Sequence, residues 1–261
     1  MKFVRLQADN GIKYGILEEE TIRVIEGDLF NSEYRLTEEI IPLQRAKLLA
    51  PCLPGKVLCI GLNYKEHAEE VGFALPEKPL IFLKSTSSIN DPEGEINYPP
   101  ETQQLEFEGE LAIVIKKEAK NVRPEEAYNY IFGYTCANDV TARDIQRRES
   151  QWMRSKSFDT FLPLGPCIVT DIDPNNLRIR SYLNGEIRQD STTAMFIHKI
   201  PEILEFATQG MTLYPGDVIL TGSPKGTGAM KIGDSIEVEL EGIGRLSNII
   251  AAGQKIAVSA K

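Results

Sequence analysis

Three glutamates between positions 105 and 110 form the first group of residues that could do chemistry. If the segment 105–115 (LEFEGELAIVI) is one β-strand, Glu106, Glu108 and Glu110 share a face, because side chains alternate across a strand. Carboxylates at such positions stand roughly 7 Å apart and repel one another. The apolar run after Glu110 indicates that this side chain is carried inward, where a hard divalent cation would balance the charge. A solvated face of an edge strand explains the pattern equally, so both interpretations stay open.

A further acidic residue, Asp139, follows an apolar segment and precedes a predicted helix. Thr141 and Asp144 have the spacing of a capping box, which predicts that this helix begins beside them. A strand-to-helix junction holds a carboxylate rigidly, and Arg143, about one helical turn on, faces the same way. Asp139 therefore either takes part in a site or helps to cap the helix while Arg143 pairs with a neighbouring acid.

The chain has only two histidines, and one of them lies in a short predicted helix. Asn63 and Glu66 have capping-box spacing, and Gly72 ends the helix. His67 and Glu70, at i and i+3, share a face, and a carboxylate that orients a histidine makes it a general base near neutral pH. So short a helix is marginal in water unless something packs on it, so it could order only when substrate binds. The alternative is a surface helix with an incidental histidine.

Three other features are weaker when taken alone. Lys156 has the spacing of ordinary surface charge, and His198 is interpreted as structural. The turn 221–228 (TGSPKGTG), which contains Ser223, offers small residues and free amides to an anionic substrate. It lacks the residue order of a P-loop and also fits a plain glycine-rich hairpin loop.

These residues depend on a framework of short strands punctuated by Asn-Gly and Pro-Gly-Asp turns. We expect strands at 3–6, 14–17, 21–25, 56–60, 80–83, 111–115, 167–169, 179–183, 218–220 and 235–240, and helices near 124–130, 142–149 and 200–208. The pattern lacks regular βαβ alternation. It predicts a mainly β fold with peripheral helices, of the α+β class, in which a small N-terminal β domain (1–53) precedes a catalytic domain (54–261).

Composition narrows the classes of partner. The net charge is −9, and no basic run offsets it, so nucleic acid and anionic membrane are not expected as partners. The first ten residues lack the apolar core of a signal peptide, and no segment approaches the roughly eighteen apolar residues of a membrane span, which favours a cytoplasmic protein. The cysteines lack Cys-x-x-Cys spacing and are expected to be buried, reduced thiols: Cys52, Cys59, Cys136 and Cys167.

Taken together and in this order, the segments resemble the fumarylacetoacetate hydrolase family. The matching motifs are GLNY at 61–64 with His67 and Glu70, PLIFLK at 79–84, EGEL at 108–111, NDVTARD at 138–144, KSFD at 156–159, LNGE at 183–186 and PGDVILTG at 215–222. The resemblance covers residues 55–257. It implies a twisted β-sandwich or β-roll around a divalent metal, Mg²⁺ or Mn²⁺ and sometimes Ca²⁺ in crystals, in a chain that is commonly a homodimer.

The resemblance also assigns roles to residues. It implies that the metal ligands are Glu108, Glu110 and Asp139, and that Glu106 is not one of them. His67 and Glu70 match a water-activating dyad on a lid helix, and Lys156 matches a lysine at the substrate's oxygens. Three further positions match residues of the substrate-binding site: Arg143, Gln146 and Ser223.

The implied activity is metal-dependent chemistry on a small 2-oxo acid, and its exact substrate is open. Our first expectation is hydrolysis of a carbon–carbon bond in a substrate of the acylpyruvate or fumarylpyruvate type, through a metal-bound enolate. The alternative is decarboxylation of oxaloacetate, or isomerisation of 2-hydroxyhepta-2,4-diene-1,7-dioate in aromatic catabolism, neither of which needs an attacking water. A non-catalytic metal-binding protein is a third, minor hypothesis.

Overall fold

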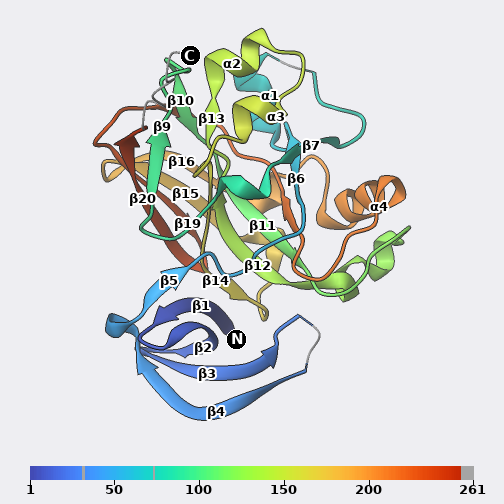
Figure 1. Cartoon of the computed structure of the whole chain (residues 1–261). Coiled ribbons are helices and arrows are strands. Elements are labelled where there is room, and N and C mark those ends of the chain that lie inside the picture. The colour runs from blue at the N-terminus through green and yellow to red at the C-terminus, as the bar shows by residue number, and fades with distance from the viewer. Residues whose placement is uncertain (31–32, 73, 254–261) are drawn as a thin grey trace, which may run out of the picture.

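The computed structural model describes residues 1–30, 33–72 and 74–253. Among these residues, strands form three sheets and helices lie at the periphery (Figure 1), which confirms the predicted mainly β fold of the α+β class. None of the helices in this part of the chain has the length and apolarity needed to cross a membrane. The cysteines named above are all free and buried, as predicted. Burial raises the pKa of Cys52 to about 12 and that of Cys167 to about 11, so both thiols stay protonated.

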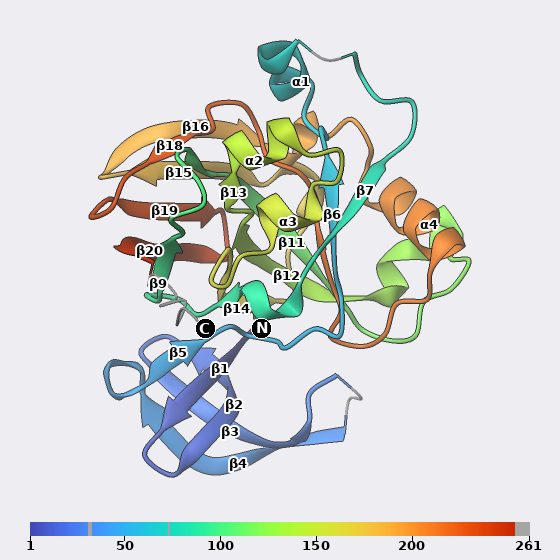
Figure 2. The same cartoon turned by 45° about the horizontal axis from the view of Figure 1, so that its top comes forward.

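The first strands form the expected antiparallel meander: β1 (Lys2–Ala8), β2 (Gly11–Glu18), β3 (Thr21–Asp28) and β4 (Glu33–Pro42). The short β5 (Lys47–Leu49) pairs with β1. β1 also pairs with β14 (Leu162–Val169), where Phe3 lies opposite Ile168, so the meander continues the large sheet. In Figures 1 and 2 these strands lie at the end of the molecule opposite α1 and α2. The division into domains at residue 53 stays a prediction.

The large sheet has the order β4-β3-β2-β1-β14-β12-β11-β17-β6-β7. Its remaining members are β6 (Val57–Gly61), β7 (Leu80–Lys84), β11 (Gly109–Ile115), β12 (Ile131–Asn138) and β17 (Val218–Leu220), and β8 (Ile89–Asn90) pairs with β14. β11 is buried along its whole length. Leu111 and Ile113 belong to one core cluster and Ala112 and Val114 to another, which explains the continuous apolar run of this strand.

Two smaller sheets complete the body of the molecule. One has the order β16 (Glu186–Thr192), β15 (Arg178–Leu183), β19 (Ser235–Leu240), β20 (Gly244–Ala252) and β9 (Glu95–Tyr98), and the other joins β13 (Thr141–Ala142), β10 (Leu105–Phe107) and β18 (Gly228–Met230). The α-helices are α1 (Lys65–Val71), α2 (Arg143–Arg148), α3 (Met153–Lys156) and α4 (Ile200–Gly210). The 3-10 helices are η1 (Leu43–Arg45), η2 (Thr86–Ser88), η3 (Pro124–Tyr130), η4 (Pro174–Asn176) and η5 (Thr193–Met195).

Residues 105–115 do not form one strand, which was the condition for three glutamates to share a face, although the expected strand 111–115 lies within β11. The segment breaks at Glu108 into β10 and β11, which pair in different sheets. At the break the Glu108 N–H donates to the Asn138 side chain at 3.0 Å, and its carbonyl accepts from Asp139 N–H at 2.8 Å. The backbone groups of Glu108 are thus satisfied without a strand partner.

Both predicted capping boxes are also wrong, although the helices exist. Tyr64 precedes α1, while the Asn63 side chain donates to the carbonyls of His198 and Thr221 at 3.1 and 2.8 Å. At α2 the flanking residue is Ala142, and Thr141 lies in β13. The Asn63 side chain is thus used between elements that are distant in the sequence, while the Thr141 hydroxyl donates to the nearby Asp139 carbonyl at 2.9 Å.

Candidate functional site

The pairing of β11 with β12 brings an acidic cluster together. Glu108 lies just before β11 and Glu110 within it, while Asp139 directly follows β12, and Gly109 is opposite Asn138 in the pair. Each of these three carboxylates offers an oxygen, and the three oxygens lie within 4.8 Å of one another. All three side chains are buried. We call Glu108, Glu110 and Asp139 the acidic triad.

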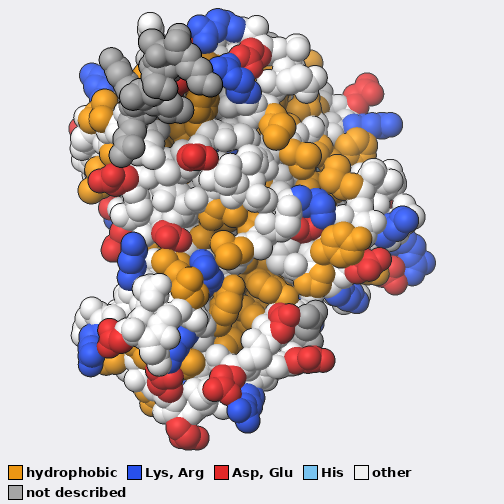
Figure 3. Space-filling view, viewed as in Figure 1, with side chains coloured by type: hydrophobic (Ala, Val, Ile, Leu, Met, Phe, Trp, Pro, Cys, Tyr) orange, Lys and Arg blue, Asp and Glu red, His pale blue; other side chains and the backbone are white. Residues whose placement is uncertain are grey.

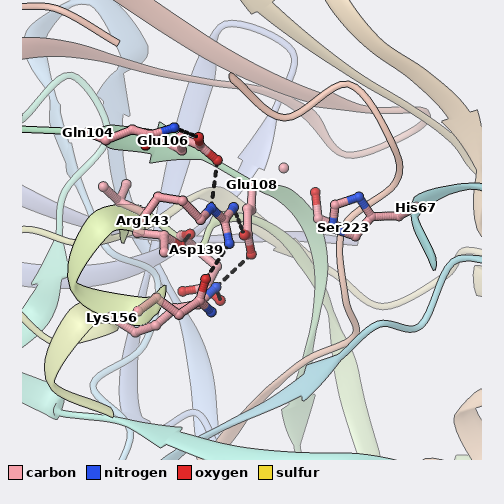
Figure 4. Close-up of polar contacts among 12 residues, drawn as sticks. His67, Gln104, Glu106, Glu108, Asp139, Arg143, Lys156 and Ser223 are labelled. Carbon is pink, nitrogen blue, oxygen red and sulfur yellow. Dashed lines mark hydrogen bonds and ion pairs between the residues drawn. The ribbon is translucent and has the colours of Figure 1, made fainter. Parts of the chain in front are cut away.

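Two lysines contact the acidic triad. Lys156 Nζ, at the end of α3, lies 2.6 Å from Glu108 Oε2 and 2.6 Å from Asp139 Oδ2 (Figure 4). Lys84 Nζ lies 2.6 Å from the other oxygen of Asp139. Spacing alone indicated surface charge at Lys156, but its side chain is buried. A buried ammonium ion needs such partners, because desolvation would otherwise favour its neutral form.

The members of the triad differ in their electrostatic surroundings. Burial opposes the ionisation of Glu108, but Lys156 and Arg143 outweigh it and lower its pKa. Burial and the nearby charges of Asp139 and Glu108 raise the pKa of Glu110 well above its usual range. Burial likewise disfavours the ammonium form of Lys156, yet Asp139 and Glu108 raise its pKa, so it stays protonated. The negative charge of the cluster is therefore least compensated at Glu110.

A hard divalent cation fits these ligands. Carboxylate oxygens are the donors that Mg²⁺, Mn²⁺ and Ca²⁺ prefer, and the spacing of the triad lets one ion contact all three. Such an ion would also offset the burial and the neighbouring negative charges that raise the pKa of Glu110. The observed geometry therefore supports a metal centre here and not the solvated strand face that the sequence left open.

Arg143 connects the acidic triad to polar side chains outside it. Its Nε donates to Glu106 Oε2 at 2.7 Å, and its other nitrogens contact Glu108 and Gln146. Gln104 Nε2 donates to the second oxygen of Glu106 at 2.6 Å. Glu106 thus pairs with Arg143 and lies outside the acidic triad.

His67 and Glu70 are in contact, while their catalytic role stays a prediction. His67 Nδ1 lies 3.0 Å from Glu70 Oε2 on α1, and the Gly226 N–H donates to Glu70 Oε1 at 3.2 Å. With Nδ1–H donating to the carboxylate, Nε2 of the neutral ring carries the lone pair that a base needs. Figure 4 places His67 and Ser223 on the opposite side of Glu108 from Arg143 and Lys156.

The loop 221–228 connects the two sides of the site. The Gly222 N–H donates to Glu110 Oε2 at 2.6 Å, with φ of +97° at Gly222. A Cβ at this position would lie 2.7 Å from Asn63 Cβ, so both the backbone conformation and the close approach require glycine. Ser223 Oγ accepts from Gln189 Nε2 at 2.8 Å.

One cavity of about 720 Å³ collects the predicted residues. It is lined by all nine: His67, Glu70, Glu108, Glu110, Asp139, Arg143, Gln146, Lys156 and Ser223. Sequence reasoning missed the contact of Lys84 with Asp139 and the places of Arg147 and Phe82 in the cavity wall. The sequence could have indicated a buried Lys84, because this residue ends the apolar strand β7 on the same face as Phe82.

The buried ion pairs lead to a stability prediction. Lys156→Met should lower the free energy of unfolding of the metal-free protein by about 3 kcal/mol or more, because Glu108 and Asp139 lose a buried partner. Urea denaturation in EDTA measures this. The matched control is Lys225→Met, which removes an exposed pair with Glu66 and should cost less than about 1 kcal/mol. Equal effects of the two substitutions would contradict the assignment of a charge-compensating role to Lys156.

Comparison with known proteins identifies the family. Residues 56–251 match the family model described as fumarylacetoacetate (FAA) hydrolase C-terminal. The chain belongs to the fumarylacetoacetate hydrolase family. Residues 1–51 match a second model, described as Rv2993c-like, N-terminal.

Three relatives of this fumarylacetoacetate hydrolase family member carry different named activities. It is 42% identical over 221 residues to mitochondrial oxaloacetate tautomerase Fahd2a of Rattus norvegicus, covering 80% of this chain and 71% of the relative. The crystal structure of 2-hydroxyhepta-2,4-diene-1,7-dioate isomerase from Mycobacterium marinum matches with a TM-score of 0.91 and 40% identity over 98% of this chain and 100% of the other. Maleylpyruvate hydrolase from Sphingobium sp. SYK-6, in complex with manganese(II) and pyruvate, matches with a TM-score of 0.82 and 26% identity, covering 97% and 100% of the two chains.

Proposed function

We propose that this protein is a divalent-metal-dependent enzyme that transfers a proton on a small 2-oxo acid by way of its enolate. One observation carries the proposal: a histidine base held by a carboxylate and an acidic triad suited to a hard cation line the same cavity. Proton abstraction beside a carbonyl needs both a base and a group that stabilises the developing negative oxygen.

Each residue has a defined task in this proposal. Glu108, Glu110 and Asp139 hold Mg²⁺ or Mn²⁺, which when bound supplies Lewis acidity to the oxygens of the substrate. His67, oriented by Glu70, takes the proton through Nε2. Lys156 stays protonated and stabilises negative charge at the substrate, and Arg143, Gln146 and Ser223 lie in the wall that surrounds it.

Keto–enol tautomerisation or double-bond isomerisation is the first candidate reaction. The relatives at 40–42% identity that are named an isomerase and an oxaloacetate tautomerase support it. Carbon–carbon hydrolysis, our first expectation from the sequence, becomes the second candidate, supported by the maleylpyruvate hydrolase structure at 26% identity. In hydrolysis His67 would deprotonate water instead of carbon.

A substrate panel tests the proposal. Oxaloacetate, acetylpyruvate, fumarylpyruvate and 2-hydroxyhepta-2,4-diene-1,7-dioate would be followed by absorbance with Mg²⁺, with Mn²⁺ and with excess EDTA. We expect metal-dependent change in at least one of them, with tautomerisation or isomerisation faster than hydrolysis. Undiminished turnover in EDTA, or no turnover of any substrate with either metal, would contradict the proposal.

We also propose that the chain forms a homodimer, as the family resemblance implies. β7 is the end strand of the large sheet, and near it Leu80, Leu83 and Met153 are exposed. Figure 3 shows hydrophobic side chains gathered over this part of the molecule. An exposed apolar surface at a sheet edge supports a contact between copies of the chain.

A further inference from the structure

The cations that line the cavity differ in how their charge is compensated. Lys156 contacts Glu108 and Asp139, and Arg143 contacts Glu106 and Glu108. Arg147 lines the same cavity, but among residues 1–30, 33–72 and 74–253 no carboxylate lies within 4.0 Å of its guanidinium nitrogens. It is therefore the cavity's uncompensated positive charge within this part of the chain.

The side chain of Arg147 is exposed, and its partner is neutral. Its Nη1 donates to Gln104 Oε1 at 3.0 Å, while Gln104 Nε2 donates to Glu106. Arg147 lies one helical turn after Arg143 on α2, and while Arg143 contacts Glu108 of the acidic triad, Arg147 contacts Gln104, so its charge is farther from the triad. A guanidinium has five N–H donors, and this contact uses one of them, which leaves a planar fork suited to a carboxylate.

The next residue on α2 differs in each of these respects. Arg148 pairs with Asp144, 3.9 Å away, and lies outside the cavity lining. Two consecutive arginines of equal charge and similar exposure thus meet different surroundings. This difference makes Arg148 a matched control for the charge of Arg147.

We propose that Arg147 is a specificity-determining residue that binds a second carboxylate of the substrate, at the end remote from the acidic triad. The substrate class is then a 2-oxo diacid and not a 2-oxo monoacid. This inference rests on the proposed function. Only a substrate whose 2-oxo acid group lies at the acidic triad would bring its second carboxylate to Arg147. Arg147 positions and selects the substrate and takes no part in the proton transfer.

Matched probes test the inference without turnover. Isothermal titration calorimetry at saturating Mg²⁺ would compare 2-oxoglutarate with 2-oxopentanoate, which has the same number of carbons but lacks the second carboxylate. A second pair, 2-oxoadipate and 2-oxohexanoate, extends the reach by one carbon. For at least one pair we expect the wild type to bind the diacid about tenfold or more tightly than the monoacid. Arg147→Gln should weaken binding of that diacid roughly tenfold to hundredfold and change monoacid binding less than about twofold.

The outcomes separate the inference from the proposed function. Arg148→Gln should leave both affinities unchanged, and Arg147→Lys should lie between wild type and Arg147→Gln, because lysine keeps the charge but loses the fork. Equal wild-type affinity for diacid and monoacid in both pairs, or equal weakening of both by Arg147→Gln, would overturn the role of Arg147 while leaving the 2-oxo acid site intact. If the wild type binds none of the four probes with Mg²⁺, the proposed function itself is wrong, and the inference falls with it.

Discussion

Glu110→Gln should lower kcat on the order of 10³-fold or more with every 2-oxo acid that the wild type converts. The substitution removes one of three carboxylates from a hard-cation site and weakens both the binding of the ion and the Lewis acidity available to the substrate. The fold should survive, because the glutamine carbonyl can still accept the Gly222 N–H. The neutral side chain also relieves repulsion by Asp139 and Glu108.

The measurement is a titration of activity with Mg²⁺ and Mn²⁺, together with thermal unfolding in EDTA. The melting temperature of metal-free Glu110→Gln should equal or exceed that of metal-free wild type. Glu118→Gln is the control, since Glu118 is exposed just beyond β11 and should change neither quantity. If Glu110→Gln kept wild-type turnover at limiting metal, the triad would not be the metal centre.

His67→Ala should lower the rates of tautomerisation and of hydrolysis on the order of 10²- to 10⁴-fold, because both reactions need a base at the same place. Decarboxylation of oxaloacetate asks mainly for an electron sink, which the metal centre and Lys156 provide. Any decarboxylase activity should therefore fall much less in the same preparation. Lys156→Ala should reduce all three activities.

The second histidine of the chain supplies the control for this experiment. His198 contacts the Pro76 carbonyl through Nε2 at 3.1 Å and is not part of the cavity lining, so His198→Ala should leave all rates near wild type. Assays of oxaloacetate enolisation and decarboxylation on the same samples at saturating Mg²⁺ make the comparison. Were His67→Ala to depress both reactions equally, His67 would be positioning α1 or the substrate and not transferring a proton.

Local patterns in the sequence predicted much of the framework because its elements obey them. The alternation in the first strands, the apolar run 111–115 and the turns at Asn184-Gly185 and Pro215-Gly216 follow from short-range chemistry. The break at Glu108 depends on Asn138, thirty residues away, which satisfies its N–H. The Asn63 side chain turns from its helix to carbonyls 135 and 158 residues distant. Such long-range bonds override local capping signals.

The candidate site was predictable to a similar extent. The family resemblance named nine residues, and all nine line one cavity, although their roles stay predictions. Burial of Lys156 could not be derived from its own segment, because it depends on carboxylates supplied by two other parts of the chain. Arg147 was not identified because its distinguishing feature, the lack of an acidic partner among the residues that the structure describes, is visible only in the arrangement in space.

The loop 221–228 holds both halves of the chemistry at once. Its Gly222 amide donates to Glu110, a proposed metal ligand, and its Gly226 amide donates to Glu70, which contacts His67, the proposed base. An insertion or deletion in this loop would therefore displace Glu110 and Glu70 together, and we expect it to impair metal binding and proton transfer at the same time. New substrate preferences in this fold are therefore expected to arise from substitutions in the opposite cavity wall. Exposed residues of α2, such as Arg147, can change there without moving Glu110 or Glu70.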